Sequence, residues 1–441
     1  MPEFKRPQTK EDFQENFAQK KPLMNDTEAY MESSRCLFCY DAPCMHACPT
    51  HIDIPLFIKQ IHTGNIKGSA KTIFDSNWLG NACGIVCPTE VLCEGACVYN
   101  HQDVKPIDIG RLQNYATAQV IEEDIQLYKP GEDNGRKVAM IGAGPASIAC
   151  ACELRTMGYK VDIFEAKDQP SGLTIYGTAP YKITNEEVLA EMNYLEKQLG
   201  YKIHYNSPVT TKEQLKKFEE QYDAVFLGVG IGPTASLGLP GSDKENVVGA
   251  VEFVEELRMK QEEVQVPDRV VVIGGGNTAM DAASESARMG AESVSLVYRR
   301  SKDAMGAYDF EYEYAVKAGV KGVFNASPLE IVGDDTAEGV KFICTKDDSG
   351  TMEYIEGSEF IIPADMVIKA TGQAKLESLF EQIDGLEIDE KRRIVVNEET
   401  YQCTNPKYFA GGDAVNGGAE VVNAAYEGKQ AARGIEQWLN E

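Results

Sequence analysis

A strand, a glycine-rich loop and a helix occur in the same order twice along the chain, 132 residues apart (137 to 269). The apolar strand Lys137–Ile141 runs into Gly142-Ala-Gly-Pro-Ala-Ser147, and the apolar strand Arg269–Ile273 runs into Gly274-Gly-Gly-Asn-Thr-Ala279. A second strand follows in each copy, at 160–164 and 293–298. Glycines at these places let the backbone approach a pyrophosphate, which then sits on the helix N-terminus. The pattern predicts an α/β fold with two Rossmann-like, dinucleotide-binding βαβ units.

The residues that end the two second strands differ. In the first copy Glu165 closes the strand, where an acid accepts hydrogen bonds from ribose hydroxyls. In the second copy the strand ends Tyr298-Arg299-Arg300, without an acid. Two guanidiniums there predict a grip on a 2′-phosphate and hence NADP(H), and the alternative is a charged, solvated strand end.

Two later segments indicate that the dinucleotide-binding domains are interleaved. Lys369-Ala-Thr-Gly372 follows an apolar strand and resembles a loop that packs on a dinucleotide. Phe409-Ala-Gly-Gly-Asp413 resembles the segment of two-dinucleotide flavoproteins that returns to the FAD, with its Asp bonded to the ribitol. We expect a helical domain at 1–130, in which Glu11–Lys20 and Ile54–Thr63 have helical spacing. We also expect an FAD-binding domain at 131–241 and 373–441, and an NAD(P)-binding domain at 242–372 inserted into it.

Eight of the 12 cysteines fall between Cys36 and Cys97. They form C-x2-C-x4-C-x3-C-P and then C-x3-C-P, followed by a further C-x3-C. Such clustering outside an oxidising compartment indicates metal binding, and eight thiols suit two [4Fe–4S] clusters. Zinc is the alternative, but its usual paired C-x2-C knuckles are not found here. The four scattered cysteines are typical of buried structural thiols.

Charge and hydropathy limit the classes of partner. Acidic residues number 69 against 43 basic ones, a net charge of −26. Such a surface repels phosphate backbones and anionic lipid, so we expect neither nucleic acid nor membrane as a partner. The start of the chain lacks the apolar region of a secretory signal, and no apolar run is long enough to span a membrane. We expect a cytoplasmic protein.

These motifs together resemble the small, NAD(P)H-oxidising subunit of bacterial dihydropyrimidine dehydrogenase and the matching N-terminal region of the single-chain animal enzyme. The small subunit of glutamate synthase shares the architecture. The segment Gly110-Arg-Leu-Gln113 separates the two families, because the dihydropyrimidine dehydrogenases have a G-x-L-Q segment whose Gln ligates iron. Glutamate synthase small subunits tend to carry Glu at that place.

The resemblance implies a role for each matching residue. One cluster is assigned Cys36, Cys39, Cys44 and Cys97, and the other is assigned Cys48, Cys87, Cys93 and Gln113, which leaves Cys83 unligated. With the loop glycines, the flavin positions are Gly142, Gly144, Pro145, Ala146, Ser147, Glu165, Gly172, Leu173, Lys182, Val209, Gly412, Asp413, Glu420, Val421 and Val422. The nicotinamide positions are Gly274, Gly275, Gly276, Asn277, Thr278, Arg299, Arg300, Ala370, Thr371 and Gly372.

The chain departs from the family pattern at three places. Ser171 stands where the family often has glycine, Lys182 where the single-chain enzyme has Arg, and Gly306 where it has a further phosphate-side Arg. The last departure weakens the expectation of NADP(H). The FMN-carrying barrel that reduces the pyrimidine in the single-chain enzyme is absent from the sequence.

The resemblance implies an oxidoreductase that is an electron-input subunit. NAD(P)H reduces FAD, and two [4Fe–4S] clusters carry the electrons to a separate FMN- and iron–sulfur-containing catalytic subunit that reduces uracil or thymine, in a hetero-oligomer. The alternatives are a glutamate synthase small subunit or a related electron-transfer subunit and, in a different class, a redox sensor.

Overall fold

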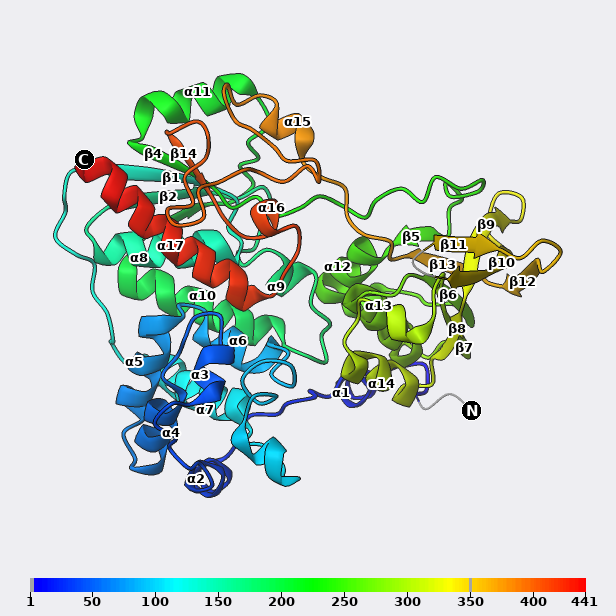
Figure 1. Ribbon diagram of the computed structural model, residues 1–441, viewed down its shortest axis with the longest axis horizontal. Coiled ribbons are helices and arrows are strands. Elements are labelled where there is room, and N and C mark those ends of the chain that lie inside the picture. Colours follow the sequence, from blue (N-terminus) through cyan, green and yellow to red (C-terminus); the bar gives the residue numbers. More distant parts are fainter. Residues whose placement is uncertain (1–3, 349–350) are drawn as a thin grey trace. The chain divides into compact units, whose positions relative to one another are not determined.

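The computed structural model describes residues 4–348 and 351–441, which form two compact units (Figure 1). The cysteine-rich unit contains residues 20–175, 182–231 and 375–441. The inserted unit contains residues 4–19, 176–181 and 232–374. The chain therefore leaves the cysteine-rich unit, builds the inserted unit and returns, as the interleaved motifs predicted.

The cysteine-rich unit begins with helices and continues into a parallel sheet. Its elements, in chain order, are α2 (Asp26–Ser34), α3 (Pro43–Ala47), α4 (Ile54–His62), α5 (Ile66–Ser76), α6 (Gly80–Val86), η1 (Val98–Gln102), α7 (Ile109–Glu122), β1 (Lys137–Ile141), α8 (Pro145–Thr156), β2 (Lys160–Phe164), α9 (Leu173–Tyr176, whose last residue falls in the inserted unit), α10 (Asn185–Leu199), β3 (Lys202–His204), α11 (Lys212–Gln221), β4 (Ala224–Leu227), α15 (Glu377–Phe380), β14 (Tyr408–Ala410), α16 (Asp413–Asn416) and α17 (Val421–Asn440).

The helical part forms because apolar residues recur at helical spacing after capping residues. Asp53 caps α4 by accepting a hydrogen bond from Leu56 N, and Ile54, Phe57, Ile58 and Ile61 then lie on one buried face. This face packs with residues of α5 and α7 in a core that also contains the thiols of Cys48 and Cys97. The cysteines are thus held by an ordinary hydrophobic core.

The sheet of the cysteine-rich unit has five parallel strands in the order β14-β4-β1-β2-β3. Alternate residues of β4 face opposite sides. Val225 and Leu227 pack with Leu215 of α11 and Phe380 of α15, whereas Phe226 lies near Gly411, on the side of α17. Helix α17, red in Figure 1, lies along α8. Both faces are therefore covered, as a parallel sheet requires.

Two buried contacts join the helical part to the sheet part. Glu191 of α10 accepts hydrogen bonds from Asn81 N (2.6 Å) and Ala82 N (3.1 Å) at the start of α6. Trp78 Nε1 donates to Glu153 Oε2 of α8 at 2.9 Å. The separate boundary expected near residue 130 is therefore not a boundary between compact units, because polar bonds inside the core cross it.

The inserted unit contains a second parallel sheet and an antiparallel one. Its elements are α1 (Lys10–Asn16), β5 (Val247–Gly249), α12 (Ala250–Lys260), η2 (Gln261–Glu263), β6 (Arg269–Ile273), α13 (Asn277–Arg288), β7 (Ser293–Tyr298), η3 (Lys302–Ala304), α14 (Asp309–Lys317), β8 (Lys321–Phe324), β9 (Ala326–Val332), β10 (Gly339–Asp348), β11 (Thr351–Tyr354), β12 (Phe360–Pro363) and β13 (Met366–Lys369).

The parallel sheet of the inserted unit has the order β5-β13-β6-β7-β8. Val270 and Val272 of β6 pack with buried residues of α12 and α13, and Val271 and Ile273 pack on the other face with the antiparallel sheet. That sheet consists of β11-β10-β12, with β9 paired to β10. One face is thus covered by helices and the other by strands.

Residues 4–19 do not join the cysteine domain as expected. Phe13 and Phe17 pack in the core of the inserted unit, and Asn16 Nδ2 donates to Arg288 O at 2.6 Å. Arg6 pairs with Asp268 at 2.6 Å. The apolar spacing of Glu11–Lys20 correctly predicted a helix, α1, but the phenylalanines bury themselves against α13. The inserted unit also begins earlier than predicted, at residue 232 rather than 242.

No helix among the described residues is both long and apolar enough to cross a membrane.

Candidate functional site

The first glycine-rich loop has a backbone that only glycine fits easily. Gly142 has a φ of +88°, and a Cβ there would lie 2.6 Å from Gly228 O, at the end of the neighbouring strand β4. Gly144 is the N-cap of α8 and provides no side-chain cap. The first N–H groups of α8 therefore have no partner from a capping side chain, which suits an anionic group such as a pyrophosphate.

Three buried hydroxyl groups near this loop have no hydrogen-bond partner among the described residues. They are Ser147 Oγ, Ser171 Oγ and Thr174 Oγ1, and each of these residues is at most 1% exposed. Ser147 lies directly against Gly228, whereas Ser171 N donates to Ala143 O at 2.7 Å within the loop. Buried polar groups are rarely left unpaired, so these hydroxyls fit a bound polar cofactor. Thr174 gave no signal in the sequence.

Ser171 shows why the family often has glycine at its position. Its φ is +79°, in the left-handed region that costs a residue with a Cβ free energy. The next residue, Gly172, has a φ of +51°, and a Cβ there would come within 3.1 Å of Gly144 Cα. The segment at 171–172 thus lies against the glycine loop, where the sequence analysis put the flavin.

The carboxylate of Glu165 is hydrogen-bonded to the backbone of the first glycine-rich loop. Its Oε2 accepts a hydrogen bond from Ala143 N at 2.6 Å, and its Oε1 accepts one from Lys167 N at 2.9 Å. Each carboxylate oxygen can accept a second bond, so both keep capacity for ribose hydroxyls. This geometry leaves Glu165 able to accept hydrogen bonds from a ribose, which is the role that the sequence predicts for it.

The C-terminal segment closes over the same loop. Gly412 has a φ of +73°, a Cβ there would lie 3.2 Å from Ala146 Cβ, and its N–H donates to Glu427 Oε2 at 2.5 Å. Burial raises the pKa of Asp413 and that of Glu427. A Cβ at Gly428 of α17 would lie only 2.0 Å from Ala146 O, so the two helices touch where α8 begins.

The remaining flavin positions fall around these elements. Glu420 caps α17, whose first residues are Val421 and Val422. Val209 is buried in the core with Ile141 and Leu227. Leu173 begins α9 and is 37% exposed, and Lys182 is half-buried before α10.

The second glycine-rich loop is more open. A Cβ at Gly274 would meet Ala370 O at 2.3 Å, so β13 packs closely here, and Ala370 N donates to Ile273 O at 2.8 Å. Gly276, the N-cap of α13, has nothing within 4 Å of an added Cβ. Thr278, Thr371 and Gly372 are exposed. The loop presents an accessible helix N-terminus.

A short segment holds this second loop in place. Ala307 N donates to Gly275 O and Tyr308 N donates to Asn277 Oδ1, each at 3.0 Å. Sequence reasoning gave no role to residues 307–308, because their contacts depend on how the chain returns from η3. At the end of β7, Arg299 is exposed and Arg300 is half-buried.

The thiols of Cys36, Cys39, Cys44 and Cys97 line one pocket, together with apolar residues such as Ile54 and Ile58. Burial, with the charges of Cys36 and Cys97 beside it, raises the pKa of Cys44 to about 12. Thiols in such surroundings stay neutral unless a metal supplies positive charge. The structure brings together the four thiols that the family resemblance assigned to one cluster.

A second group of thiols adjoins the first. Cys48 follows α3, Cys87 follows α6, and Cys93 lies in the next turn. Burial, with the charges of Glu94, Cys87 and Cys48 nearby, raises the pKa of Cys93. A side-chain hydrogen bond to Cys83, followed by burial, raises the pKa of Cys87. Cys83 itself is 2% exposed in α6.

Gln113 of α7 is 7% exposed, and its Nε2 donates to Gly80 O at 2.7 Å. A peptide carbonyl only accepts hydrogen bonds, so it fixes which end of the amide faces it. The amide oxygen then remains for another partner, which is the orientation that a metal-ligating Gln needs.

No three or more His, Cys, Asp or Glu side chains among residues 4–348 and 351–441 converge closely enough to hold a single metal ion. A four-iron cluster binds each thiolate to a different iron and so spaces its ligands more widely.

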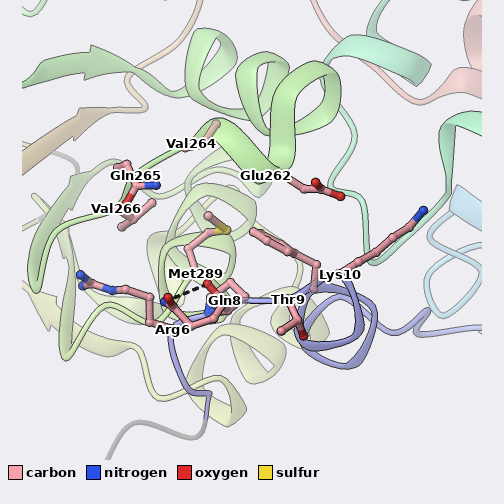
Figure 2. A pocket seen from close by; sticks show the side chains of 11 residues that line it. Arg6, Gln8, Thr9, Lys10, Glu262, Val264, Gln265, Val266 and Met289 are labelled. Carbon is pink, nitrogen blue, oxygen red and sulfur yellow. Dashed lines mark hydrogen bonds between the residues drawn. The ribbon is translucent and has the colours of Figure 1, made fainter.

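Figure 2 shows a pocket of about 270 Å³ in the inserted unit, between residues 6–13 and 262–289, which none of the predicted site residues lines.

Comparison with protein families and curated proteins agrees with this geometry. Residues 13–125 match the family described as dihydropyrimidine dehydrogenase domain II, 4Fe–4S cluster, and residues 136–428 match the pyridine nucleotide-disulphide oxidoreductases. The chain is 34% identical over 420 residues to the NAD-dependent dihydropyrimidine dehydrogenase subunit PreT of Escherichia coli (strain K12), covering 95% of this chain and 96% of that protein. It is 35% identical over 437 residues to the glutamate synthase [NADPH] small chain of the same organism, covering 94% and 92%.

Solved structures share the fold at lower identity. Mycobacterium tuberculosis FprA in complex with NADPH matches with a TM-score of 0.58 and 20% identity, over 69% of this chain and 84% of that chain. The thioredoxin reductase of T. acidophilum matches with a TM-score of 0.55 and 22% identity, over 69% of this chain and 100% of that chain.

The fold and the site define an NAD(P)-dependent oxidoreductase that uses FAD and iron–sulfur chemistry. The chain belongs to the pyridine nucleotide-disulphide oxidoreductase family, with an N-terminal 4Fe–4S domain of the dihydropyrimidine dehydrogenase type. Within that family it is an electron-transfer subunit similar to PreT.

Proposed function

We propose that this chain is the electron-input subunit of a dihydropyrimidine dehydrogenase. It oxidises NAD(P)H through FAD and passes electrons through two [4Fe–4S] clusters to a separate FMN- and iron–sulfur-containing subunit, which reduces uracil or thymine. The similarity to PreT along nearly the whole chain supports this proposal.

The observation that carries the proposal is the environment of Gln113. The carbonyl of Gly80 lies 2.7 Å from the amide nitrogen of Gln113 and can only accept a hydrogen bond. A Glu carboxylate there would face this carbonyl with no proton to donate, at a cost of about 1–3 kcal/mol for the unpaired groups. The site therefore favours Gln, the residue of the dihydropyrimidine dehydrogenases, over Glu.

The arrangement of the thiols supports an order of electron transfer. A hydrogen bond to Cys83 and burial raise the pKa of the Cys87 thiol, and the charge of Glu420, which caps α17, adds to this shift. Cys87 of the second set is therefore the thiol that we place toward the predicted flavin positions. The other set is flanked by the loop with Leu37, Phe38 and Tyr40, all exposed, so electrons leave through it.

The protein contributes orientation and electrostatics. Bound FAD supplies the hydride acceptance and one-electron release that connect a nicotinamide to iron–sulfur clusters. With FAD bound, Glu165 would hold the ribose, the N-terminus of α8 would face the pyrophosphate, and α17 would shield the site from water.

The test uses the purified chain with its cofactors. It should oxidise NAD(P)H with ferricyanide as acceptor, contain about eight irons, as two four-iron clusters require, and leave uracil unchanged. Adding an FMN-containing catalytic subunit should restore uracil reduction. Uracil turnover by the chain alone, or no oxidation of either nucleotide, would contradict the proposal.

A second candidate function is that of a glutamate synthase small subunit, which the 35% identity to that chain favours. In that case electrons pass to a glutamine-dependent partner. Steady glutamate formation on mixing with a glutamate synthase large subunit, without uracil reduction by the FMN subunit, would select this alternative.

A further inference from the structure

The end of strand β7 lacks an acid in the sequence, and the structure shows what takes its place. Gly142 N donates to Phe164 O at 2.8 Å in the first copy, and Gly274 N donates to Val297 O at 3.0 Å in the second. The two copies therefore align so that Tyr298 corresponds to Glu165. A Cβ at Gly275 would lie 2.4 Å from the Tyr298 ring, and Tyr298 OH donates to Ala304 O at 2.9 Å. At the end of strand β7, the aromatic ring of Tyr298 therefore lies against Gly275, where the first copy has the carboxylate of Glu165.

An acid from another strand lies close to the end of β7. Asp347 of β10 lies with its Oδ2 3.4 Å from Arg300 Nε, and the two side chains are 21% and 39% exposed. The contact is an ion pair in a partly buried place, where water screens the charges less than at an open surface. Arg300 is therefore not a lone cation at the end of β7.

Hydrogen bonds to the carbonyl groups of residues 299 and 300 hold strand β10 near Asp347 in place. Thr345 Oγ1, two residues before it on β10, donates to Arg299 O at 2.6 Å, and Asn325 N donates to Arg300 O at 3.0 Å. Alternate residues of a strand point to the same side, so Thr345 and Asp347 both face the end of β7. The antiparallel sheet is thereby held against residues 299–300.

We infer that Asp347 makes the nicotinamide site select NADH over NADPH, an inference that rests on the proposed NAD(P)H-oxidising function. A carboxylate can accept a hydrogen bond from a 2′-hydroxyl and repels a 2′-phosphate. The same carboxylate offsets the charge of Arg300, one of the two guanidiniums that the sequence analysis gave to a phosphate. Arg299, which is exposed, keeps its charge at the site. The pair Arg299 and Arg300 alone predicts a preference for NADPH, so measuring the nucleotide preference distinguishes the two hypotheses.

The experiment compares Asp347→Asn with Glu353→Gln in the cofactor-loaded protein. Glu353 is an exposed acid on β11 that pairs in register with Lys346, so its variant removes one negative charge from the same sheet away from Arg300. Dissociation constants for NAD⁺ and NADP⁺ are measured by calorimetry, and kcat/KM for NADH and NADPH with ferricyanide.

The unmodified protein should bind NAD⁺ at least about ten-fold more tightly than NADP⁺, as one charge-assisted bond implies. Asp347→Asn should improve NADP⁺ binding about ten-fold, and adding Arg300→Ala should reverse that gain. Glu353→Gln should change neither ratio. A native preference for NADP⁺, or equal effects of Asp347→Asn and Glu353→Gln, would overturn the inference. Failure of both nucleotides to reduce the flavin would instead overturn the proposed function.

Discussion

The two glycine-rich loops share one fingerprint but differ in what packs over them. In the cysteine-rich unit, α17 touches the start of α8 at Gly428, and three unpaired hydroxyls lie buried beside the loop. In the inserted unit, Gly276 has open space around it, and Thr278 and Gly372 are exposed. A covered loop suits a group that stays bound through many turnovers, and an open one suits a substrate that exchanges in each turnover. The glycine fingerprint is the same for a bound cofactor and for an exchanging substrate. The difference lies in whether another helix covers the helix N-terminus, which the fingerprint does not encode.

The largest expected difference follows from adding a side chain at Gly428, which lies against the start of α8, and at Gly276, which lies in the open second loop. Gly428→Leu puts a side chain where Ala146 O already lies 2.0 Å from an added Cβ. Overpacking of this kind costs about 1–3 kcal/mol or more, so we expect flavin content per chain to fall at least about ten-fold. Gly276→Ala meets nothing within 4 Å and should leave flavin content unchanged while weakening nicotinamide binding. Equal flavin loss in both variants would break the comparison. Flavin absorbance per chain and melting temperature measure the outcome.

The two sets of cysteine thiols lie in the same unit as the covered first loop, so they show whether changes at the clusters also affect the flavin. Gln113→Ala removes the amide that Gly80 O orients, so we expect it to lose or perturb one cluster while flavin content stays near normal. The matched control is Cys83→Ser, which should keep both clusters, about eight irons by the two-cluster proposal. Iron analysis and electron paramagnetic resonance of the reduced protein measure both. If Cys83→Ser loses a cluster and Gln113→Ala keeps both clusters, then Cys83 is the ligand and Gln113 is not.

A smaller effect is expected at the equivalent positions Glu165 and Tyr298. Glu165→Gln loses a carboxylate that accepts from Ala143 N at 2.6 Å. Hydrogen bonds to charged groups contribute about 1.5–3 kcal/mol, so FAD affinity should fall about ten- to a hundred-fold. Tyr298→Phe removes only the bond to Ala304 O and should leave FAD affinity as it is. Titration of the deflavinated protein with FAD gives both values, and a flavin defect in Tyr298→Phe would contradict the alignment.

The smallest expected effect concerns pH. Burial raises the pKa of Glu191 to about 8, although two backbone N–H groups partly oppose the shift. A carboxyl whose folded pKa lies above its unfolded value binds more protons in the folded state, so the free energy of unfolding falls as pH rises from about 5 to about 8. Glu191→Gln should flatten this dependence, which amounts to a few degrees in the melting temperature. A melting temperature that rises over this range in the unmodified protein would contradict the prediction.

The regular elements that carry the fingerprints could be predicted from sequence. The strands at 137–141, 160–164, 269–273 and 293–298 are confirmed with these bounds, because apolar runs that end at glycine or at charge specify them locally. The predicted helix at 54–63 is confirmed as α4, one residue shorter. Residues 4–19 were assigned to the wrong unit, since an amphipathic helix does not specify which core receives its phenylalanines.

The site could be predicted only where local patterns or the family resemblance reached. The grouping of the thiols came from the resemblance, and the pocket shared by Cys36 and Cys97 is compatible with it. Glu191 contacts Asn81, which lies 110 positions away along the chain. Asp347 contacts Arg300, which lies 47 positions away (347 − 300). Nothing in a local pattern distinguishes Glu191 and Asp347 from the many acids of the surface, so only tertiary packing reveals their contacts.

The contact between Gly428 and Ala146 also has a consequence for biosynthesis. Helix α17 follows every other described element of its unit along the chain, whereas β1 and α8 precede residues 232–374, the longest segment of the inserted unit. During translation the thiol-bearing helices and the first glycine loop leave the ribosome early, but the lid over that loop leaves it late. If the first loop holds the flavin, as we propose, iron–sulfur assembly can begin on a nascent chain, while lasting capture of flavin must wait until α17 has been made and has docked on α8.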